Sequence, residues 1–234
     1  MWYKEILCYP RYSDEEFKSR KQELAELGIE DLIEDGNTII FGKRILGKGT
    51  TSLVVKALYH GFFVALKIRR TDSNRESVEN EALILKMLND TGISPKIFAY
   101  SKNFIVMELI RGINLDDFIL RASNEEIKPV LVKLLLSCIL LDKMGIDHGD
   151  LTNASDHVVV YDKNIRIIDF ESASTKRKPQ NLTSIISYLF LSNRSFSQKL
   201  YGIINKQEDE LILLLRKYKK GEYGALNSLI EDLK

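Results

Sequence analysis

The sequence contains little cysteine and has no long apolar run. Its 234 residues include two cysteines, Cys8 and Cys138, which lie far apart in apolar surroundings. A disulfide framework or a cysteine metal site is therefore not expected, and both are predicted to be buried thiols in a reducing interior. The most apolar stretch, VLVKLLLSCILL at 130–141, has a lysine inside it. It falls short of the roughly 18 apolar residues that mark a membrane span.

Strong net charge and a leader pattern are also missing. The formal net charge of +1 gives no electrostatic footprint for nucleic acid, although local patches remain possible. The beginning, MWYKEILCYPRYSDEE, lacks a cationic segment followed by an apolar one. We therefore expect a cytoplasmic protein without a membrane or nucleic-acid partner. Its length suits one large domain or two lobes.

The most informative stretch is Asp147–Ser174. Two acidic residues, Asp150 and Asp169, flank two short β-branched runs, His157–Tyr161 and Ile165–Ile168. Such runs predict two antiparallel strands, here joined by a three-residue loop at 162–164. Because a hairpin brings its outer ends together, both carboxylates could face one site, suited to metal and phosphate binding or to acid–base chemistry. The alternative is that both aspartates only cap turns.

The N-terminal part predicts a helix. Ser13 precedes DEEFKSRKQELAELG, which starts with acidic residues and ends at Gly28. Serine as N-cap and glycine past the end favour a helix of about four turns. Its apolar edge, Leu24, Leu27 and Ile29, indicates an extension docked on the next part of the chain. The alternative is a partner-binding arm.

From Thr38 the periodicity changes to that of strands. Three β-rich runs come next, separated by a glycine-containing segment at 47–54 and by His60–Gly61, which is a hairpin signal. A helical pattern covers 73–90, and two further strands, PKIFAY and FIVMELI, end at residue 110. These elements predict a five-stranded antiparallel sheet that carries one helix.

The second half is predicted to be helical. LDDFILRA forms a short helix, and the longer helix at 124–145 is expected to be capped by Asn124, to end near Gly145 and to be buried. The basic loop TKRKPQN at 175–181 is either solvated or meets an acidic partner. Further helices are expected near Leu182–Leu191, Ser197–Asn205, Gln207–Lys219 and Ala225–Leu233.

Four motifs carry a resemblance to protein kinases. HGDLTNAS at 148–155 resembles the kinase catalytic loop, in the His-Gly-Asp form of small RIO-type and KEOPS-associated archaeal kinases. IIDFE at 167–171 resembles the metal-binding DFG segment, with Glu171 in place of the glycine. The 47–54 segment resembles the G-x-G-x-x-G-x-V loop, with Ser52 at the third glycine, and VALK ends in Lys67. The resemblance covers roughly Thr38 to Ser174.

The resemblance implies an α+β, two-lobed protein kinase-like fold. Its N-lobe would be the five-stranded antiparallel sheet with one helix, and its C-lobe would be reduced and helical, without a long activation segment. The expected division is an N-terminal helical extension at 1–36, an N-lobe at 37–110 and a C-lobe at 111–234.

The resemblance also implies site residues. Asp150 would orient the attacking hydroxyl and accept its proton, and Asp169 would hold Mg²⁺ or Mn²⁺. Lys67 would contact the ATP phosphates and pair with Glu81 or, failing that, Glu79. The remaining nucleotide-binding positions would be Gly47, Gly49, Ser52, Val54, Ala65 and Met107, together with the backbone of Glu108 and Ile110.

The second metal ligand departs from the family pattern. An asparagine is usual five residues after the catalytic aspartate and directly before a strand. The five-residue spacing selects Ser155, whereas the position directly before the strand selects His157. A two-residue insertion leaves Ser155, Asp156 and His157 as candidates, with Asn153 less favoured. Because Mg²⁺ prefers oxygen, Asp156 is the choice; the alternative is that Asp156 only caps a turn.

The resemblance predicts transfer of the γ-phosphoryl group of ATP to a serine or threonine hydroxyl of a protein, possibly the chain itself. Two other functions stay open. Ser52 and Glu171 would suit a nucleotide-binding pseudokinase scaffold. The DF-E segment and the missing activation segment would also suit a small-molecule kinase.

Overall fold

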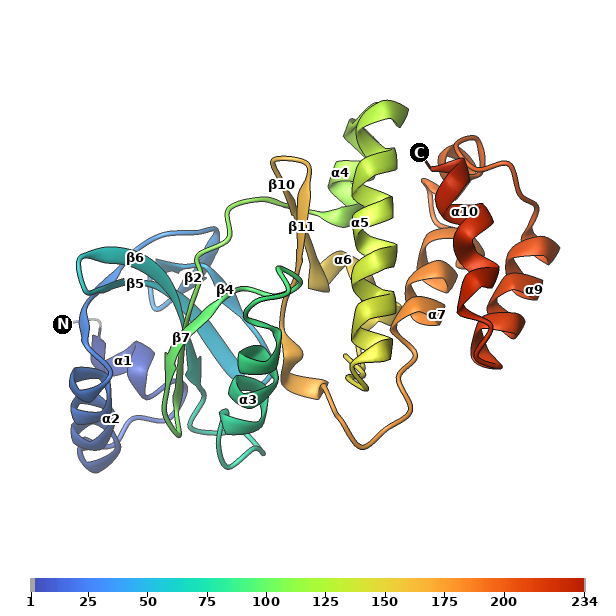
Figure 1. The fold of residues 1–234 in the computed structure, drawn as a ribbon. Coiled ribbons are helices and arrows are strands. Elements are labelled where there is room, and N and C mark those ends of the chain that lie inside the picture. The colour runs from blue at the N-terminus through green and yellow to red at the C-terminus, as the bar shows by residue number, and fades with distance from the viewer. Residues whose placement is uncertain (1–2, 234) are drawn as a thin grey trace. The chain divides into compact units, whose positions relative to one another are not determined.

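An antiparallel sheet organises the first of two units, Met1–Ile110, in a computed structural model that describes residues 3–233 (Figure 1). The strand order is β1-β5-β6-β8-β7, and β4 also pairs with β5. This agrees with the predicted α+β class. The strands are β1 (Ile29–Ile33), β4 (Gly47–Lys48), β5 (Ser52–Tyr59), β6 (Phe62–Arg69), β7 (Ile97–Tyr100) and β8 (Phe104–Met107).

The sheet has six strands, so the predicted number of five is wrong. The run at Thr38 does not join it, because β2 (Thr38–Ile40) and β3 (Lys43–Ile45) form a hairpin of their own. Its place is taken by β1, from the segment expected to be an N-terminal extension. The acidic pair in IEDLI gives β1 no clear strand alternation, which is why the sequence pattern missed it.

The β5–β6 hairpin is as predicted. Tyr59 pairs with Phe62, so that His60 and Gly61 form a two-residue turn. Both turn residues have positive φ, 47° and 79°, as a type I′ turn requires. The strands alternate, and one face of β5 and β6 supplies fully buried Leu53, Val55, Ala57, Val64, Leu66 and Ile68 to the core.

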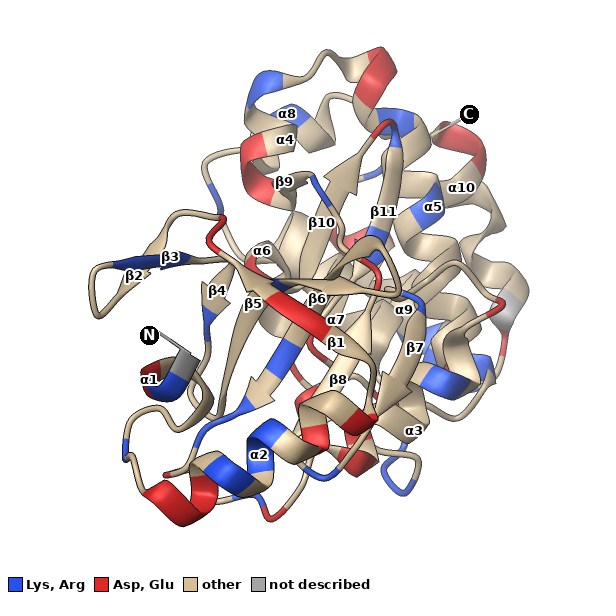
Figure 2. Cartoon of the chain, turned by 90° about the vertical axis from the view of Figure 1, so that its left-hand side faces the viewer, with Lys and Arg blue, Asp and Glu red and all other residues tan. Residues whose placement is uncertain are grey.

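Three helices belong to this unit: α1 (Tyr3–Leu7), α2 (Asp14–Glu26) and α3 (Glu79–Leu88). The predicted ends of α2 are confirmed: Ser13 Oγ accepts the Glu16 N–H, and Gly28 follows with φ 82°. The helix begins with acidic residues and continues with basic ones (Figure 2). It is docked, as expected, with Leu24 in the core and Leu27 and Ile29 packed against it. Arg20, which is also fully buried, was not predicted.

The second unit, Arg111–Lys234, is built on a long helix, α5 (Asn124–Lys143), which buries one face and leaves Leu136 and Leu140 exposed. It comes after α4 (Leu115–Arg121). The predicted cap Asn124 is wrong, because Ser123 and Glu126 form a capping box one residue earlier. Gly145 follows the helix with φ 72°. No helix in the described part of the chain is long and apolar enough to cross a membrane.

The Asp147–Ser174 stretch contributes two strands to a small sheet in this unit. The strands of this sheet are β9 (Ile113–Asn114), β10 (Val158–Tyr161) and β11 (Asn164–Ile167), in the order β11-β10-β9. The predicted hairpin is present, but its turn has two residues, Asp162 and Lys163, both with positive φ. Asn164 therefore belongs to β11. Gly112 is required, since a Cβ there would lie 2.3 Å from the Val160 oxygen.

The later helices lie in the predicted segments, whereas α6 (Ala154–His157) was not predicted and takes His157 from the strand that was expected to begin there. The later helices are α7 (Asn181–Ile186) continued by a π-helical turn at Ser187–Leu191, α8 (Ser197–Tyr201), α9 (Glu208–Lys219) and α10 (Asn227–Asp232). Short 3-10 turns lie at Leu151–Asn153, Phe170–Ser172 and Tyr223–Leu226. Cys8 and Cys138 are buried free thiols, as expected, and burial raises both pKa values.

Candidate functional site

A buried ion pair marks the site in the first unit. Lys67 Nζ lies 2.8 and 2.7 Å from the two carboxylate oxygens of Glu81. Both residues are buried, at 3% and 4% exposure. Lys67 lies in β6 between β5 and β8, and Glu81 lies in the first turn of α3. Glu79, the fallback partner, is exposed. A lysine fixed from both oxygens presents a charge of defined position, which suits phosphate binding.

The predicted base-binding side chains share one face of the sheet with Lys67. Val54 is directly opposite Lys67, and Ala65 is two residues before it on the same strand. Met107 is opposite Ala65 on β8. Since side chains alternate along a strand, all four project to the same side. The sheet register thus brings together residues from three separate strands.

The backbone after β8 is partly engaged already. The Glu108 N–H donates to the Lys96 oxygen at 2.8 Å, and the Glu108 carboxylate accepts the Lys96 N–H. The Glu108 N–H is therefore already engaged within the protein. Ile110 lies two residues further on, in the coil that ends this unit.

The glycine segment forms a tight reversal between β4 and β5. Gly47 pairs with Val54, and the Gly49 N–H donates to the Ser52 oxygen at 2.8 Å. Ser52 itself is buried. A Cβ at Gly47 would meet nothing within 4 Å, and one at Gly49 would be 3.5 Å from its nearest neighbour. The turn alone therefore does not require these glycines, whose effect is to leave the loop surface open.

In the second unit, Asp150 and Asp169 are linked through the ring of His148. The His148 ring is fully buried. Its Nε2 lies 3.0 Å from the Ile168 oxygen, and its Nδ1 lies 3.4 Å from the backbone nitrogen of Asp150. Burial lowers the pKa of His148 to about 4, so the ring is neutral at pH 7. In that form Nε2–H donates to Ile168 and Nδ1 accepts from Asp150.

Gly149 explains the His-Gly-Asp form of the loop. Its φ is 94°, and a Cβ there would lie 2.7 Å from the Arg177 guanidinium and 2.9 Å from the Ser172 oxygen. A larger residue would collide with the segment that comes after Asp169. Glycine is therefore needed for both conformation and space.

Asp169 adopts the left-handed conformation, with φ 63° and ψ 68°. Among residues other than glycine, aspartate is one of those that tolerate this region. The exposed Asp169 is followed by fully buried Phe170, whose ring meets that of His148 at 4.7 Å. A strained backbone held by packing on its neighbour is typical of functional sites.

The second-ligand candidates lie in or beside α6. Asp156 is exposed, and its carboxylate accepts a hydrogen bond from Asn153 Nδ2. Ser155 lies in α6 and is half-buried. Within the described residues, the buried Nδ1 of His157 has no hydrogen-bond partner.

The donor chemistry of the second unit fits magnesium. Asp169 and Asp156 offer oxygen ligands, whereas His157 offers a nitrogen that Mg²⁺ disfavours. No group of three or more His, Cys, Asp or Glu side chains in residues 3–233 could hold a metal ion. A metal that uses one or two carboxylates and completes its shell with phosphate and water does not require such a group.

Asn181 supports this loop and was missed by the sequence analysis. It is 1% exposed; its Oδ1 accepts the His148 N–H at 2.8 Å, and its Nδ2 donates to Asp142 and to the Ile146 oxygen, both at 2.7 Å. Asp142 also accepts from Tyr218, and burial raises its pKa. No local pattern indicates a contact across 33 residues.

The basic loop at 175–181 is exposed at most of its positions, and Arg177 anchors it to the rest of the unit. Arg177 Nε donates to Asp147 at 2.9 Å, and its Nη2 donates to the Ser172 oxygen at 2.7 Å. Asp147 also accepts the Gln180 N–H. The segment after Asp169 thus folds back on Asp147, while Lys176 and Lys178 remain exposed.

Comparison with known proteins agrees with the kinase motifs. Serine/threonine-protein kinase cds1 of Schizosaccharomyces pombe is 31% identical over 144 residues, which are 54% of this chain and 31% of cds1. Probable serine/threonine-protein kinase fnkE of Dictyostelium discoideum is 30% identical over 150 residues, which are 53% of this chain and 11% of fnkE. The chain thus spans less than a third of either kinase.

A shorter relative is similar along its whole length. Uncharacterized protein MJ1211 of Methanocaldococcus jannaschii is 28% identical over 117 residues, which are 49% of this chain and 99% of MJ1211.

The RIO domain family model matches residues 58–197, more than half of the chain. The match includes Lys67, Glu81, Asp150 and Asp169, and begins after the glycine segment. The predicted resemblance to RIO-type kinases is confirmed, and the chain belongs to the RIO domain family of the protein kinase-like superfamily.

Proposed function

We propose that the protein transfers the γ-phosphoryl group of ATP to a serine or threonine hydroxyl of a protein substrate, which can be a second copy of the chain or the chain itself. The observation that carries the proposal is the buried Lys67–Glu81 pair. It occurs in a chain that also links an acidic catalytic loop to a left-handed Asp169 through His148. Family membership supports a kinase-like phosphotransferase, and the serine/threonine acceptor comes from the named relatives.

Each proposed role is argued from charge and position. Lys67, held by Glu81, would bind the α- and β-phosphates, and Gly47, Gly49 and Ser52 would let the backbone approach them. Val54, Ala65 and Met107 would contact the base, with hydrogen bonds from the backbone at Glu108 and Ile110. Asp150 would orient the acceptor hydroxyl and take its proton.

A divalent cation belongs to the same proposal. Asp169, with Asp156 as second ligand, would hold Mg²⁺ or Mn²⁺. The cation supplies neutralisation of the negative charge on the phosphates. The protein contributes fixed positions, because phosphoryl transfer needs little covalent help.

A γ-labelled ATP assay with Mg²⁺ and with Mn²⁺ tests the proposal, using the wild type and Asp150→Ala. We expect label on the chain or on an added protein acceptor, and loss of that label in Asp150→Ala. Asp162→Ala is the matched control, because Asp162 lies in the exposed β10–β11 turn. Equal labelling in all three proteins would refute the proposal.

A nucleotide-binding scaffold is the second candidate. The residue directly before β10 is His157, which gives a poor magnesium ligand at that position. Saturable ATP binding without transfer to protein would favour this function. Transfer to an added small alcohol or amine, but not to protein, would instead favour a small-molecule kinase.

A further inference from the structure

Arg70 joins the end of β6 to the glycine segment. Its Nη1 donates to the Gly49 oxygen at 3.0 Å, and its backbone N–H donates to the Thr51 oxygen at 2.8 Å. The Gly49–Ser52 turn is therefore held at two points by one residue. Arg70 lies three positions after Lys67, so the strand that places the phosphate-binding lysine also places this contact.

Two neighbours fix the Arg70 side chain. Asp72 accepts from Nε at 2.9 Å and from Nη2 at 2.7 Å, which leaves Nη1 for Gly49. The guanidinium carbon also lies 5.2 Å from the centre of the Tyr9 ring. Lys48 Nζ, on β4, lies 5.3 Å from the same ring. The Tyr9 ring thus contacts two cations, Lys48 before the Gly49–Ser52 turn and Arg70 after β6. Attraction between a cation and an aromatic ring stabilises both contacts.

Thr71 fixes the backbone around Tyr9. Its N–H donates to the Tyr9 oxygen at 2.8 Å, and its hydroxyl accepts the Arg11 N–H at 3.0 Å. The hydroxyl hydrogen can reach the carbonyl of Cys8, Tyr9 or Arg11, each at 3.1–3.2 Å. Because these bonds connect residues about 60 positions apart, they tie the N-terminal segment to the residue after Arg70.

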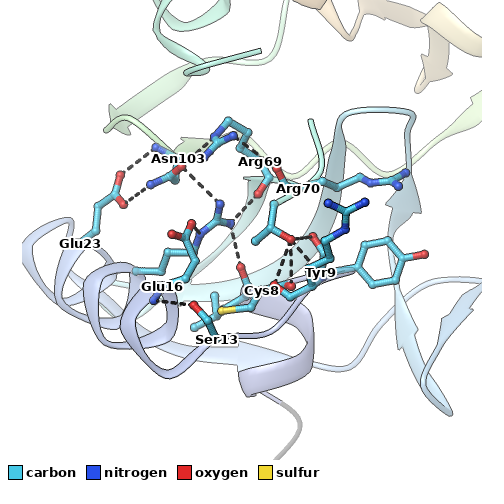
Figure 3. Close-up of polar contacts among 12 residues, drawn as sticks. Cys8, Tyr9, Ser13, Glu16, Glu23, Arg69, Arg70 and Asn103 are labelled. Carbon is cyan, nitrogen blue, oxygen red and sulfur yellow. Dashed lines mark hydrogen bonds and ion pairs between the residues drawn. The ribbon is translucent and has the colours of Figure 1, made fainter. Parts of the chain in front are cut away.

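Helix α2 holds the end of β6 through a separate set of hydrogen bonds (Figure 3). Buried Arg20 donates from Nη1 to the Leu7 oxygen at 2.8 Å and to the Arg69 oxygen at 2.5 Å. Glu23 accepts both the backbone and side-chain N–H groups of Asn103, each at 2.8 Å. Asn103 Oδ1 in turn accepts from Arg69 Nε. The N-terminal segment therefore holds three consecutive residues, 69–71.

We propose that residues 7–26 form a structural part of the phosphate-binding loop. Through Tyr9 and Arg70 they hold the Gly49–Ser52 turn in one position, and these two are positioning residues for nucleotide binding. The consequence for ATP rests on the proposed function, whereas the ordering of the turn does not.

Hydrogen exchange of the free protein tests the ordering directly. We expect the amides at 49–52 to exchange faster in Tyr9→Ala and in Arg70→Met, with the amides at 53–59 of β5 and those of β8 unchanged. Tyr9→Phe keeps the ring face and should exchange like the wild type. Unchanged exchange at 49–52 in both disruptive variants would overturn the inference. Thr51→Gly, which leaves the N-terminal segment intact but loosens the turn, shows that the measurement can detect such a change.

Titration with an ATP analogue and Mg²⁺ tests the consequence. Loss of a charged hydrogen bond that orders the loop should raise Kd about tenfold in Arg70→Met, and by a similar factor in Tyr9→Ala. Tyr12→Ala removes an exposed ring from the same segment and should leave Kd unchanged. Equal Kd in Arg70→Met and wild type would refute the role in binding. If the wild type binds no nucleotide, the proposed function fails, while the exchange experiment still decides the inference.

Discussion

His148 Nε2 lies 3.0 Å from the carbonyl oxygen of Ile168, the residue before Asp169. The bond requires a proton on Nε2, and the contact with the Asp150 N–H requires a bare Nδ1. A single neutral tautomer thus satisfies both backbone groups. Protonation would place a second donor against the Asp150 N–H.

This arrangement predicts a loss of stability in acid. The folded-state pKa of His148, about 4, lies below its ordinary value of 6.5, so the unfolded chain takes up the proton first. Neutral His148 makes its full contribution to the free energy of unfolding above pH 6.5. As the pH falls toward 4, the free energy of unfolding decreases by about 3 kcal/mol. Urea unfolding between pH 7 and pH 4 measures it.

The matched control is the exposed His60. His60→Gln should keep the pH dependence, and His148→Gln should flatten it. A slope that is the same in His148→Gln and in wild type would show that other groups cause the acid sensitivity.

The Lys67–Glu81 pair predicts a double effect of Lys67→Met. We expect phosphoryl transfer to fall by orders of magnitude, because the phosphates lose their cation. Because Lys67 is buried, its replacement should also affect folding. Glu81 would be left buried without its partner, at a cost of about 3 kcal/mol. Lys67→Met combined with Glu81→Gln should recover part of this stability without activity.

The two aspartates should differ in their effect on nucleotide binding. Asp169→Asn should abolish the Mg²⁺-dependent part of ATP-analogue affinity, because the metal bridges the phosphates. Asp150→Asn should leave that affinity nearly intact and abolish transfer, since its carboxylate meets the acceptor hydroxyl. Titrations with and without Mg²⁺ distinguish them. Equal losses of affinity would contradict this division of roles.

Asp156 should affect the metal requirement alone. Asp156→Ala is expected to raise the Mg²⁺ concentration for half-maximal transfer, without changing nucleotide affinity in the absence of metal. Asp162→Ala, which removes an exposed carboxylate from the neighbouring turn, should change neither quantity. An unchanged Mg²⁺ requirement in Asp156→Ala would show that Asp156 is not a metal ligand and only caps a turn.

Asn181→Ala should destabilise the second unit although the residue has no proposed catalytic role. It removes partners from the His148 N–H, the Ile146 oxygen and Asp142, all in buried or partly buried positions. Leaving such groups unsatisfied costs about 1–3 kcal/mol. Denaturant midpoints of this variant and of Asn205→Ala, an exposed position, measure the difference.

Local chemistry predicted much of the fold. Ser13 and Gly28 bound α2, and His60–Gly61 makes the β5–β6 turn. The apolar run at 130–141 lies within α5, although the helix buries only one face. Each of these features depends on residues a few positions apart. Errors arose where two local signals competed. Ser123 took the cap from Asn124 because its capping box with Glu126 satisfies two N–H groups.

The contacts that hold the site were beyond the reach of local patterns. Arg20 contacts Arg69 across 49 residues, and Arg177 contacts Asp147 across 30. Nothing in the composition around either arginine distinguishes it from a solvated one. Motif resemblance identified the candidate chemical groups, but the residues that position those groups depend on tertiary packing.

The boundaries of the family match and the strand pairing of the first unit do not coincide. The match begins at residue 58, inside β5. The strands β1 (29–33) and β4 (47–48), which pair with β5, lie before it. A chain trimmed to the matched region would cut β5 short and remove both of these partner strands. The matched region therefore lacks two strands that pair with β5 in the structure, and the open edge of β5 in a shortened protein would favour association with another chain.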